Sequence, residues 1–160
     1  MKQEEKVVEI LKKHQLKLTT IESCTAGAIA ARIVDVPGAS EVFEQSFVTY
    51  SNEAKMRAVK VREEIFEKYG AVSGECAKEM VYGGLLEAKA DIAISATGFA
   101  GPSGGWEAPV GTVFIGCGFA KDIQVREYHL NGSRSKVREE AVACAICQLY
   151  DYLSEHFEHL

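Results

Sequence analysis

Six helix-like segments and five strand-like runs occur along this chain, and their order limits the folds that the chain can adopt. They follow one another as α-β-α-β-α-α-α-β-β-β-α. Because the helices between the early strands require crossover connections, those strands are expected to run parallel in one sheet. The runs at 111–119 and 123–130 are separated only by Ala120-Lys121-Asp122, which is the pattern of an antiparallel hairpin.

This order predicts an α/β fold, namely a three-layer α/β/α sandwich around a mixed, mostly parallel five-stranded sheet with one antiparallel hairpin. We expect a single domain over residues 1–160, because that length is ordinary for one domain. Helices are expected at 3–14, at 28–34, from a cap at Ser51 or Asn52 through Lys55, and at 62–69, 73–88 and 135–156. Strands are expected at 17–21, 46–50, 91–97, 111–119 and 123–130.

Composition excludes some classes of function. The chain is 47% hydrophobic and 26% charged, with a formal net charge of −5 at pH 7. This acidic balance argues against sequence-independent nucleic-acid binding, which requires a basic face. No apolar stretch approaches the roughly 18 residues of a membrane span, and the N-terminus lacks the apolar core of a signal peptide. The odd number of cysteines, five, fits a reducing compartment, so we expect a cytoplasmic protein.

The segment 97–112 contains five glycines between two apolar, strand-like runs. Backbone N–H groups in such a loop can form a concave nest for an anion, typically a phosphate. The alternative is an ordinary long connection with a turn at Pro102. Two other polar segments, Glu22–Gly27 and Tyr50–Lys55, also follow predicted strand ends. Because ligands gather beyond the carboxyl ends of strands in open α/β sheets, we expect these three segments to form one site.

Ser23 follows the first strand at a predicted turn into a helix. A hydroxyl there can face N–H groups at the helix N-terminus, which would stabilise an oxyanion. The alternative is that Ser23 or Thr25 only caps the helix. Cys24 is a second candidate nucleophile, although a small buried thiol is the commoner role for such a residue.

Lys55 lies in the first turn of its predicted helix, where a cation opposes the helix dipole. To act as a base it would need a pKa well below the ordinary lysine value of about 10.4, which burial can produce. If Lys55 meets Ser23, the two form a workable Ser–Lys pair for nucleophilic catalysis. The alternative is a solvated lysine beside Arg57 and Lys60.

Two further polar side chains could contact a substrate. Tyr50, at a strand end, can donate a hydrogen bond or stack on a ring, or else is a core or rim tyrosine. Arg134, at the start of the last helix, is suited to a phosphate contact, or else is an exposed charge near the cap.

Four motifs occur in the order seen in the CinA C-terminal domain family, which the chain resembles from about residue 5 to 153. They are Glu22-Ser23-Cys24-Thr25-Ala26-Gly27, Val48-Thr49-Tyr50-Ser51-Asn52-Glu53-Ala54-Lys55, Gly70-Ala71-Val72-Ser73, and the glycine loop with its Pro109-Val110-Gly111-Thr112-Val113 exit. The resemblance implies a nicotinamide-nucleotide amidohydrolase, which converts nicotinamide mononucleotide and water to nicotinate mononucleotide and ammonia in pyridine nucleotide recycling. It implies a small-molecule nucleotide substrate, no metal or organic cofactor, and a homo-oligomer, dimer or larger.

The resemblance also implies roles for individual residues. Ser23 would be the nucleophile, Lys55 the general base and acid, and Tyr50 an orienting group. The expected substrate-binding residues are Thr25, Thr97, Gly98, Gly101, Gly104, Gly105 and Arg134. This chain departs from the family pattern at Ala26, where glycine is usual, at Ala108, where lysine is common, and at Ser133, which replaces an acidic residue.

Two other functions fit the same motifs. One is a non-catalytic nucleotide-binding module, a sensor or partner domain, because a phosphate cradle does not require hydrolysis. The other is hydrolysis of a different small amide, such as another phosphorylated amide.

Overall fold

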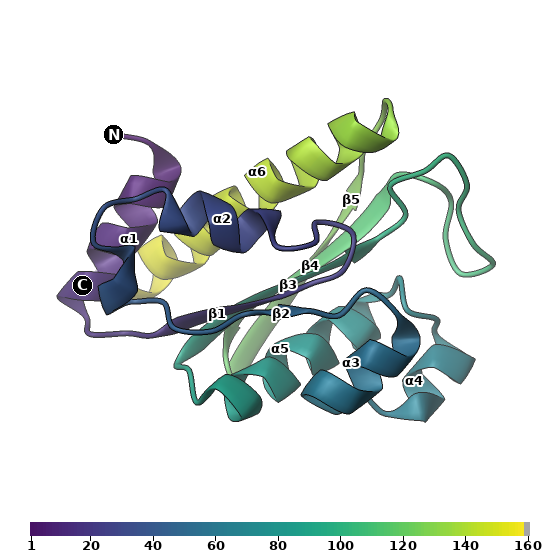
Figure 1. Cartoon of the computed structure of the whole chain (residues 1–160), viewed down its shortest axis with the longest axis horizontal. Helices are drawn as coiled ribbons and strands as arrows, with labels where there is room; N and C mark the ends of the chain where they lie inside the picture. The colour runs from purple at the N-terminus through teal and green to yellow at the C-terminus, as the bar shows by residue number, and fades with distance from the viewer. Residues whose placement is uncertain (159–160) are drawn as a thin grey trace.

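A computed structural model describes residues 1–158 as a five-stranded sheet between two layers of helices (Figure 1). Helices α1 (Gln3–Lys13), α2 (Ala28–Val34) and α6 (Arg134–Leu153) cover one face of the sheet, and α3 (Asn52–Val59), α4 (Glu63–Lys68) and α5 (Gly74–Ala88) cover the other. The strands are β1 (Leu18–Glu22), β2 (Phe47–Val48), β3 (Ile92–Gly98), β4 (Thr112–Phe119) and β5 (Asp122–His129), in the order β2-β1-β3-β4-β5. The described residues also form a 3₁₀ turn at Ala39–Glu41 and a π-helical turn at Ser154–Glu158.

The predicted three-layer sandwich and mixed sheet are confirmed, with one correction to the strand pairing. Strand β1 pairs in parallel with β2 and β3, whereas β4 is antiparallel to both β3 and β5. The sheet therefore has two antiparallel pairs, not the single pair of the hairpin. The connection at 99–111 contains no helix to return the chain to the starting edge, so β4 begins beside the end of β3.

The two faces of the sheet carry separate apolar cores. Leu18 and Ile94 belong to the core beneath α1, α2 and α6, while Ile21 and Ala93 pack with Met80 and the other helices. This alternation on the buried strands β1 and β3 follows the two-residue period of a strand. The carboxyl ends of β1, β2 and β3 then lie at one edge of the sheet. Among the described residues, no helix is both long enough and apolar enough to cross a bilayer.

Helix α3 is held against α5 at a glycine. A Cβ atom added to Gly83 would overlap the backbone carbonyl oxygen of Val59, which cannot move aside as a side chain can. We expect Gly83→Ala to destabilise the fold by about 3 kcal/mol, measured as a lower urea midpoint. The matched control is Gly74→Ala on the same helix, where the nearest atom to the new Cβ is 3.5 Å away. Equal midpoints for the two variants would contradict this packing of α3.

Candidate active site

A cavity of about 390 Å³ lies where the three parallel strands end. Of the ten residues expected to form a site, seven line it: Ser23, Tyr50, Lys55, Thr97, Gly98, Gly101 and Arg134. Thr25, Gly104 and Gly105 are not among its lining residues. Cys24, Asn52, Ala71, Val72, Phe99, Ala100, Pro102 and Ser103 complete the wall. The expected convergence of the three polar segments is therefore found.

Ser23 and Lys55 meet inside this cavity. Lys55 Nζ lies 3.1 Å from Ser23 Oγ and donates a hydrogen bond to the carbonyl of Thr49 at 2.8 Å. Lys55 is only 1% exposed, and Ser23 is also buried. The lysine reaches this place from the first turn of α3, which Ser51 begins by accepting a hydrogen bond from the Ala54 N–H. The pair is therefore assembled by the two segments that follow the parallel strands β1 and β2.

The surroundings of Lys55 favour its neutral form. Burial lowers the pKa of its amine because the charged form loses its hydration, and the nearby thiols of Cys76 and Cys24 oppose this only in part. Within residues 1–158, no carboxylate forms an ion pair with Lys55. An amine in this state has a lone pair that can accept the proton of the Ser23 hydroxyl.

The expected donors at the start of α2 are not available to a ligand. Glu22 is fully buried, and its Oε1 atom accepts hydrogen bonds from the N–H groups of Gly27 and Ile29. Its Oε2 atom accepts from the Ala30 N–H and the Thr20 hydroxyl. The expectation that the N–H groups at the start of this helix face the Ser23 hydroxyl is therefore wrong. Sequence reasoning missed Glu22, although a carboxylate just before a helix is the group that the helix dipole favours there.

The turn between Ser23 and α2 contains residues in left-handed conformation. Ala26 has φ 49° and Gly27 has φ 94°. Ala26, where the family usually has glycine, thus adopts the turn despite its Cβ. Arg138 holds the same turn from α6, donating to the carbonyls of Cys24 at 2.8 Å and Thr25 at 3.3 Å. Arg138 lies one helical turn beyond Arg134, a spacing that could have indicated its proximity.

Arg134 joins two walls of the cavity. It donates to the carbonyl of Gly101 at 2.6 Å and to the Tyr50 hydroxyl at 2.9 Å. Arg134 is the first residue of α6, one residue earlier than predicted, because Ser133 caps the helix by accepting from the Lys136 N–H. Ser133, which replaces an acidic residue of the family pattern, therefore still provides a helix cap.

Three other candidate side chains near the site, Cys24, Thr97 and Thr25, are buried in the fold. Burial raises the pKa of the Cys24 thiol to about 11, so it is protonated at neutral pH and the buried-thiol interpretation is favoured over a nucleophile. Thr97 donates to the carbonyl of Ala71 at 2.8 Å, which fixes the end of β3 to the loop before α5. Thr25 is fully buried, and its hydroxyl has no hydrogen-bond partner among the described residues.

The glycine loop is packed largely against itself. A Cβ on Gly104 would come within 2.6 Å of the Val110 backbone nitrogen, and one on Gly105 would come within 2.5 Å of the Phe99 ring. These two glycines allow the limbs of the loop to approach each other. Residues 98–103 of the same loop form one part of the cavity wall. Across residues 1–158, no group of three His, Cys, Asp or Glu side chains is placed to hold a metal ion.

Comparison with known proteins identifies the family. The family model for the CinA C-terminal domain matches residues 1–153. The chain belongs to this family. It is 48% identical over 136 residues to a CinA-like protein of Dictyoglomus thermophilum, and 47% identical over 141 residues to one of Fusobacterium nucleatum. These matches cover 84% and 88% of the chain but only 33% and 34% of the two relatives. The CinA C-terminal domain described here therefore spans about a third of the length of these relatives.

Solved structures of the family share the fold of this CinA domain. A CinA superfamily protein from Klebsiella pneumoniae is 35% identical, with a TM-score of 0.92 and 96% of both chains covered. One from Escherichia coli is 34% identical, with a TM-score of 0.89, covering 92% of this chain and 86% of that one. The names of these relatives refer to competence and damage and specify no reaction.

Proposed function

We propose that this CinA domain is an amidohydrolase that converts nicotinamide mononucleotide and water to nicotinate mononucleotide and ammonia. The observation that carries the proposal is the buried contact of 3.1 Å between Lys55 Nζ and Ser23 Oγ. A lysine with a lowered pKa beside a serine is an activated nucleophile that needs neither histidine nor metal. The resemblance of the motifs to those of nicotinamide-nucleotide amidohydrolases supports the choice of substrate.

In the first half of the proposed reaction, Ser23 Oγ attacks the carboxamide carbon while the Lys55 amine takes the hydroxyl proton. The oxyanion of the tetrahedral intermediate would accept hydrogen bonds from the backbone N–H groups of Cys24 and Thr25, since the donors of α2 are bonded to Glu22. The C–N bond then breaks. Lys55 returns its proton to the departing nitrogen, which leaves as ammonia, and an ester of Ser23 remains.

In the second half, water attacks the ester carbon and Lys55 accepts a proton from it. The ester bond breaks, Ser23 Oγ recovers a proton from Lys55, and the carboxylic acid product gives its own proton to solvent. The lysine therefore begins and ends each half-reaction as a neutral amine, which its burial favours. All five cysteines of the chain are free thiols, which supports our placing of this reaction in the reducing cytoplasm.

The 5′-phosphate is proposed to bind at the mouth of the cavity. Arg134 already spans from Gly101 to Tyr50 there, so its guanidinium is held in one orientation at the cavity wall. A guanidinium presents several N–H donors that match phosphate oxygens. Binding of the remote phosphate would place the carboxamide against Ser23, and this positioning contributes to turnover as well as to affinity.

Nicotinamide, which lacks the ribose phosphate, is therefore expected to be a poor substrate. We expect its kcat/KM for ammonia release to be at least about 100-fold below that of nicotinamide mononucleotide. Arg134→Gln should lower the rate on the nucleotide while leaving the slow rate on nicotinamide almost unchanged. Lys136→Gln, an exposed neighbour on the same helix, is the control and should alter neither. Comparable rates on the two substrates in a coupled ammonia assay would count against the phosphate contact.

A further inference from the structure

The turn between β1 and α2 contains two backbone donors that no other group of the fold uses. Glu22 accepts hydrogen bonds from the N–H groups at the start of α2, and the Ala26 N–H donates to the Ser23 carbonyl at 3.1 Å. Within residues 1–158, the N–H groups of Cys24 and Thr25 donate to no other residue. These two N–H groups are therefore the donors of the turn that remain for an oxyanion.

Arg138 determines the direction of one of these donors. Its Nε atom donates to the Cys24 carbonyl at 2.8 Å, and no other described residue donates to that oxygen. A trans peptide is planar, so its C=O and N–H groups point in opposite directions. Because the Cys24 carbonyl points toward α6, the Thr25 N–H of the same peptide points away from α6, toward the face of the sheet that α3 covers (Figure 1). Lys55 reaches Ser23 from that face.

Only this one peptide of the turn depends on Arg138. The Thr25 carbonyl accepts from Arg138 at 3.3 Å, but it also accepts from the Ala28 N–H at 3.0 Å and so stays bonded without the arginine. The Glu22 carboxylate holds the start of α2 independently. Loss of the Arg138 side chain would therefore release the peptide between Cys24 and Thr25 and leave the rest of the turn in place.

The charge of Arg138 also favours an anion at this turn. A hydrogen bond from an ionised donor is stronger than one from a neutral donor, and it polarises the peptide that accepts it, which makes the N–H of that peptide a better donor. Burial raises the pKa of the Cys24 thiol to about 11, and Arg138 is among the groups that oppose this rise. Arg138 does not line the cavity, so it contacts the donor and not the substrate.

We infer that Arg138 is a positioning residue for the oxyanion of the proposed amidohydrolase reaction, on which this inference rests. It fixes the peptide between Cys24 and Thr25 so that the Thr25 N–H faces the developing negative charge, and its own charge strengthens that donor. The two arginines of α6 then have separate tasks. Arg134 holds the phosphate of the substrate, whereas Arg138 acts on the transition state through the backbone.

Two substitutions that keep the stem of the Arg138 side chain test this role. Arg138→Met removes both the donor and the charge, and it should lower kcat for ammonia release from nicotinamide mononucleotide about 100-fold while KM changes less than about twofold. Arg138→Gln places an amide nitrogen at the same position along the side chain as Nε, so it can restore the bond to the Cys24 carbonyl without the charge. It should recover about tenfold of the lost kcat. A general loosening of the fold would instead change KM and the thermal midpoint as well.

Amide NMR follows the peptide without an assay of activity. The chemical shift of the Thr25 amide nitrogen responds to the hydrogen bond at the Cys24 carbonyl, because both atoms belong to one peptide. It should change in Arg138→Met and return toward its original value in Arg138→Gln. The signals of Gly27 and Ile29, whose N–H groups are bonded to Glu22, should stay in place.

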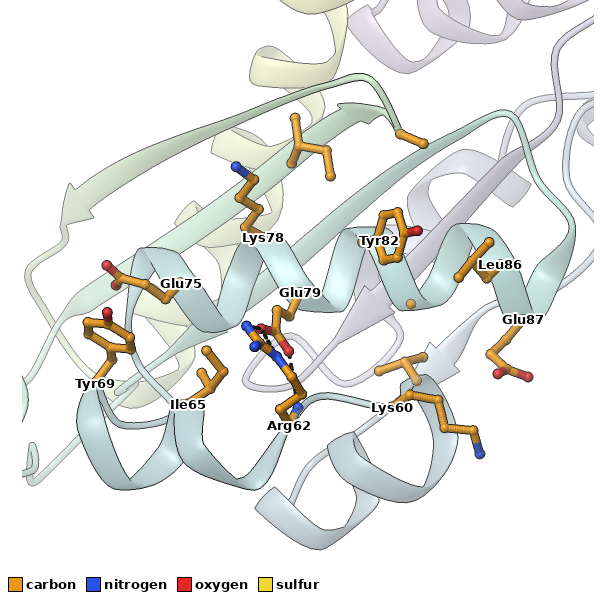
Figure 2. Close-up of a pocket in the computed structure, with 14 residues that line it drawn as sticks. Lys60, Arg62, Ile65, Tyr69, Glu75, Lys78, Glu79, Tyr82, Leu86 and Glu87 are labelled. Atoms are coloured by element: carbon orange, nitrogen blue, oxygen red, sulfur yellow. Dashed lines mark hydrogen bonds and ion pairs between the residues drawn. The ribbon is translucent and has the colours of Figure 1, made fainter.

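Arg62→Met is the matched control. The Arg62 Nε atom donates to Glu79 at 2.9 Å in a groove of about 630 Å³ beside α5 (Figure 2). None of the residues that line this groove lines the candidate active site. This variant loses an arginine contact between two segments of the chain, as Arg138→Met does, and should keep the kcat of the unmodified protein.

The possible failures are distinguishable. An unmodified protein that releases no ammonia from nicotinamide mononucleotide would overturn the proposed function and this inference together. An active protein whose Arg138→Met variant keeps its kcat would overturn the inference alone. So would a fall in kcat with an unchanged Thr25 signal, or one that Arg138→Gln does not reduce.

Discussion

Ser23→Ala is expected to lower ammonia release from nicotinamide mononucleotide by about 10³-fold or more, because the substitution removes the atom that attacks the carboxamide. Binding of the nucleotide should survive, since the proposed phosphate contact at Arg134 is untouched. Ammonia release by a coupled assay and binding by titration calorimetry measure the two quantities separately. Cys24→Ala is the neighbouring control and should retain activity within a few-fold, because its buried thiol is protonated.

These two measurements also separate the enzyme from the non-catalytic alternative. A sensor or partner domain would bind the nucleotide in both forms and release no ammonia in either. Full activity in Ser23→Ala would exclude this serine as the nucleophile. Activity on a different small amide, lost in the same variant, would retain the Ser–Lys chemistry and correct only the substrate.

Lys55→Arg is expected to lower the same rate by about 10²- to 10⁴-fold, the usual contribution of a general acid–base group. Arginine keeps the positive charge but cannot give up its proton near neutral pH, so it cannot accept the proton of Ser23. In the unmodified protein, kcat/KM should rise with pH through the lowered pKa of Lys55 and then level off, since the neutral amine is the active form. Lys60→Arg, an exposed lysine at the end of α3, is the matched control. Normal activity in Lys55→Arg would contradict a base at this position.

The arrangement of the layers was predictable because burial leaves a strong pattern in the sequence. β3 is buried on both faces over nearly its whole length, and its run of apolar and small residues indicated this. The convergence of the segments that carry Ser23 and Lys55 followed from a rule of topology, since each segment follows a parallel strand that ends at the same edge of the sheet. The contact between the two side chains is a finding of the structure. Local sequence patterns were sufficient to predict the site wherever a topological rule of this kind related one segment of the chain to another.

Other features depend on contacts that no local pattern contains. The glycines at 104 and 105 suggested a ligand's approach, but they accommodate the opposite limb of their own loop. The direction of β4 depended on a loop without a helix, which sequence periodicity does not specify. Glu22 accepts hydrogen bonds from the N–H groups at the start of α2 because both of its carboxylate oxygens reach forward across the turn. Arg138 reaches that turn from more than a hundred residues away in the chain.

The proposed reaction depends on Lys55 being a neutral amine in contact with Ser23. NMR titration of the lysine ε-groups measures the pKa of the Lys55 amine directly. The signal that disappears in Lys55→Met is the one that belongs to Lys55. We predict that the Lys55 amine titrates well below the ordinary lysine pKa of about 10.4. A Lys55 signal that titrates near that ordinary value would contradict the proposed role of Lys55 as a base.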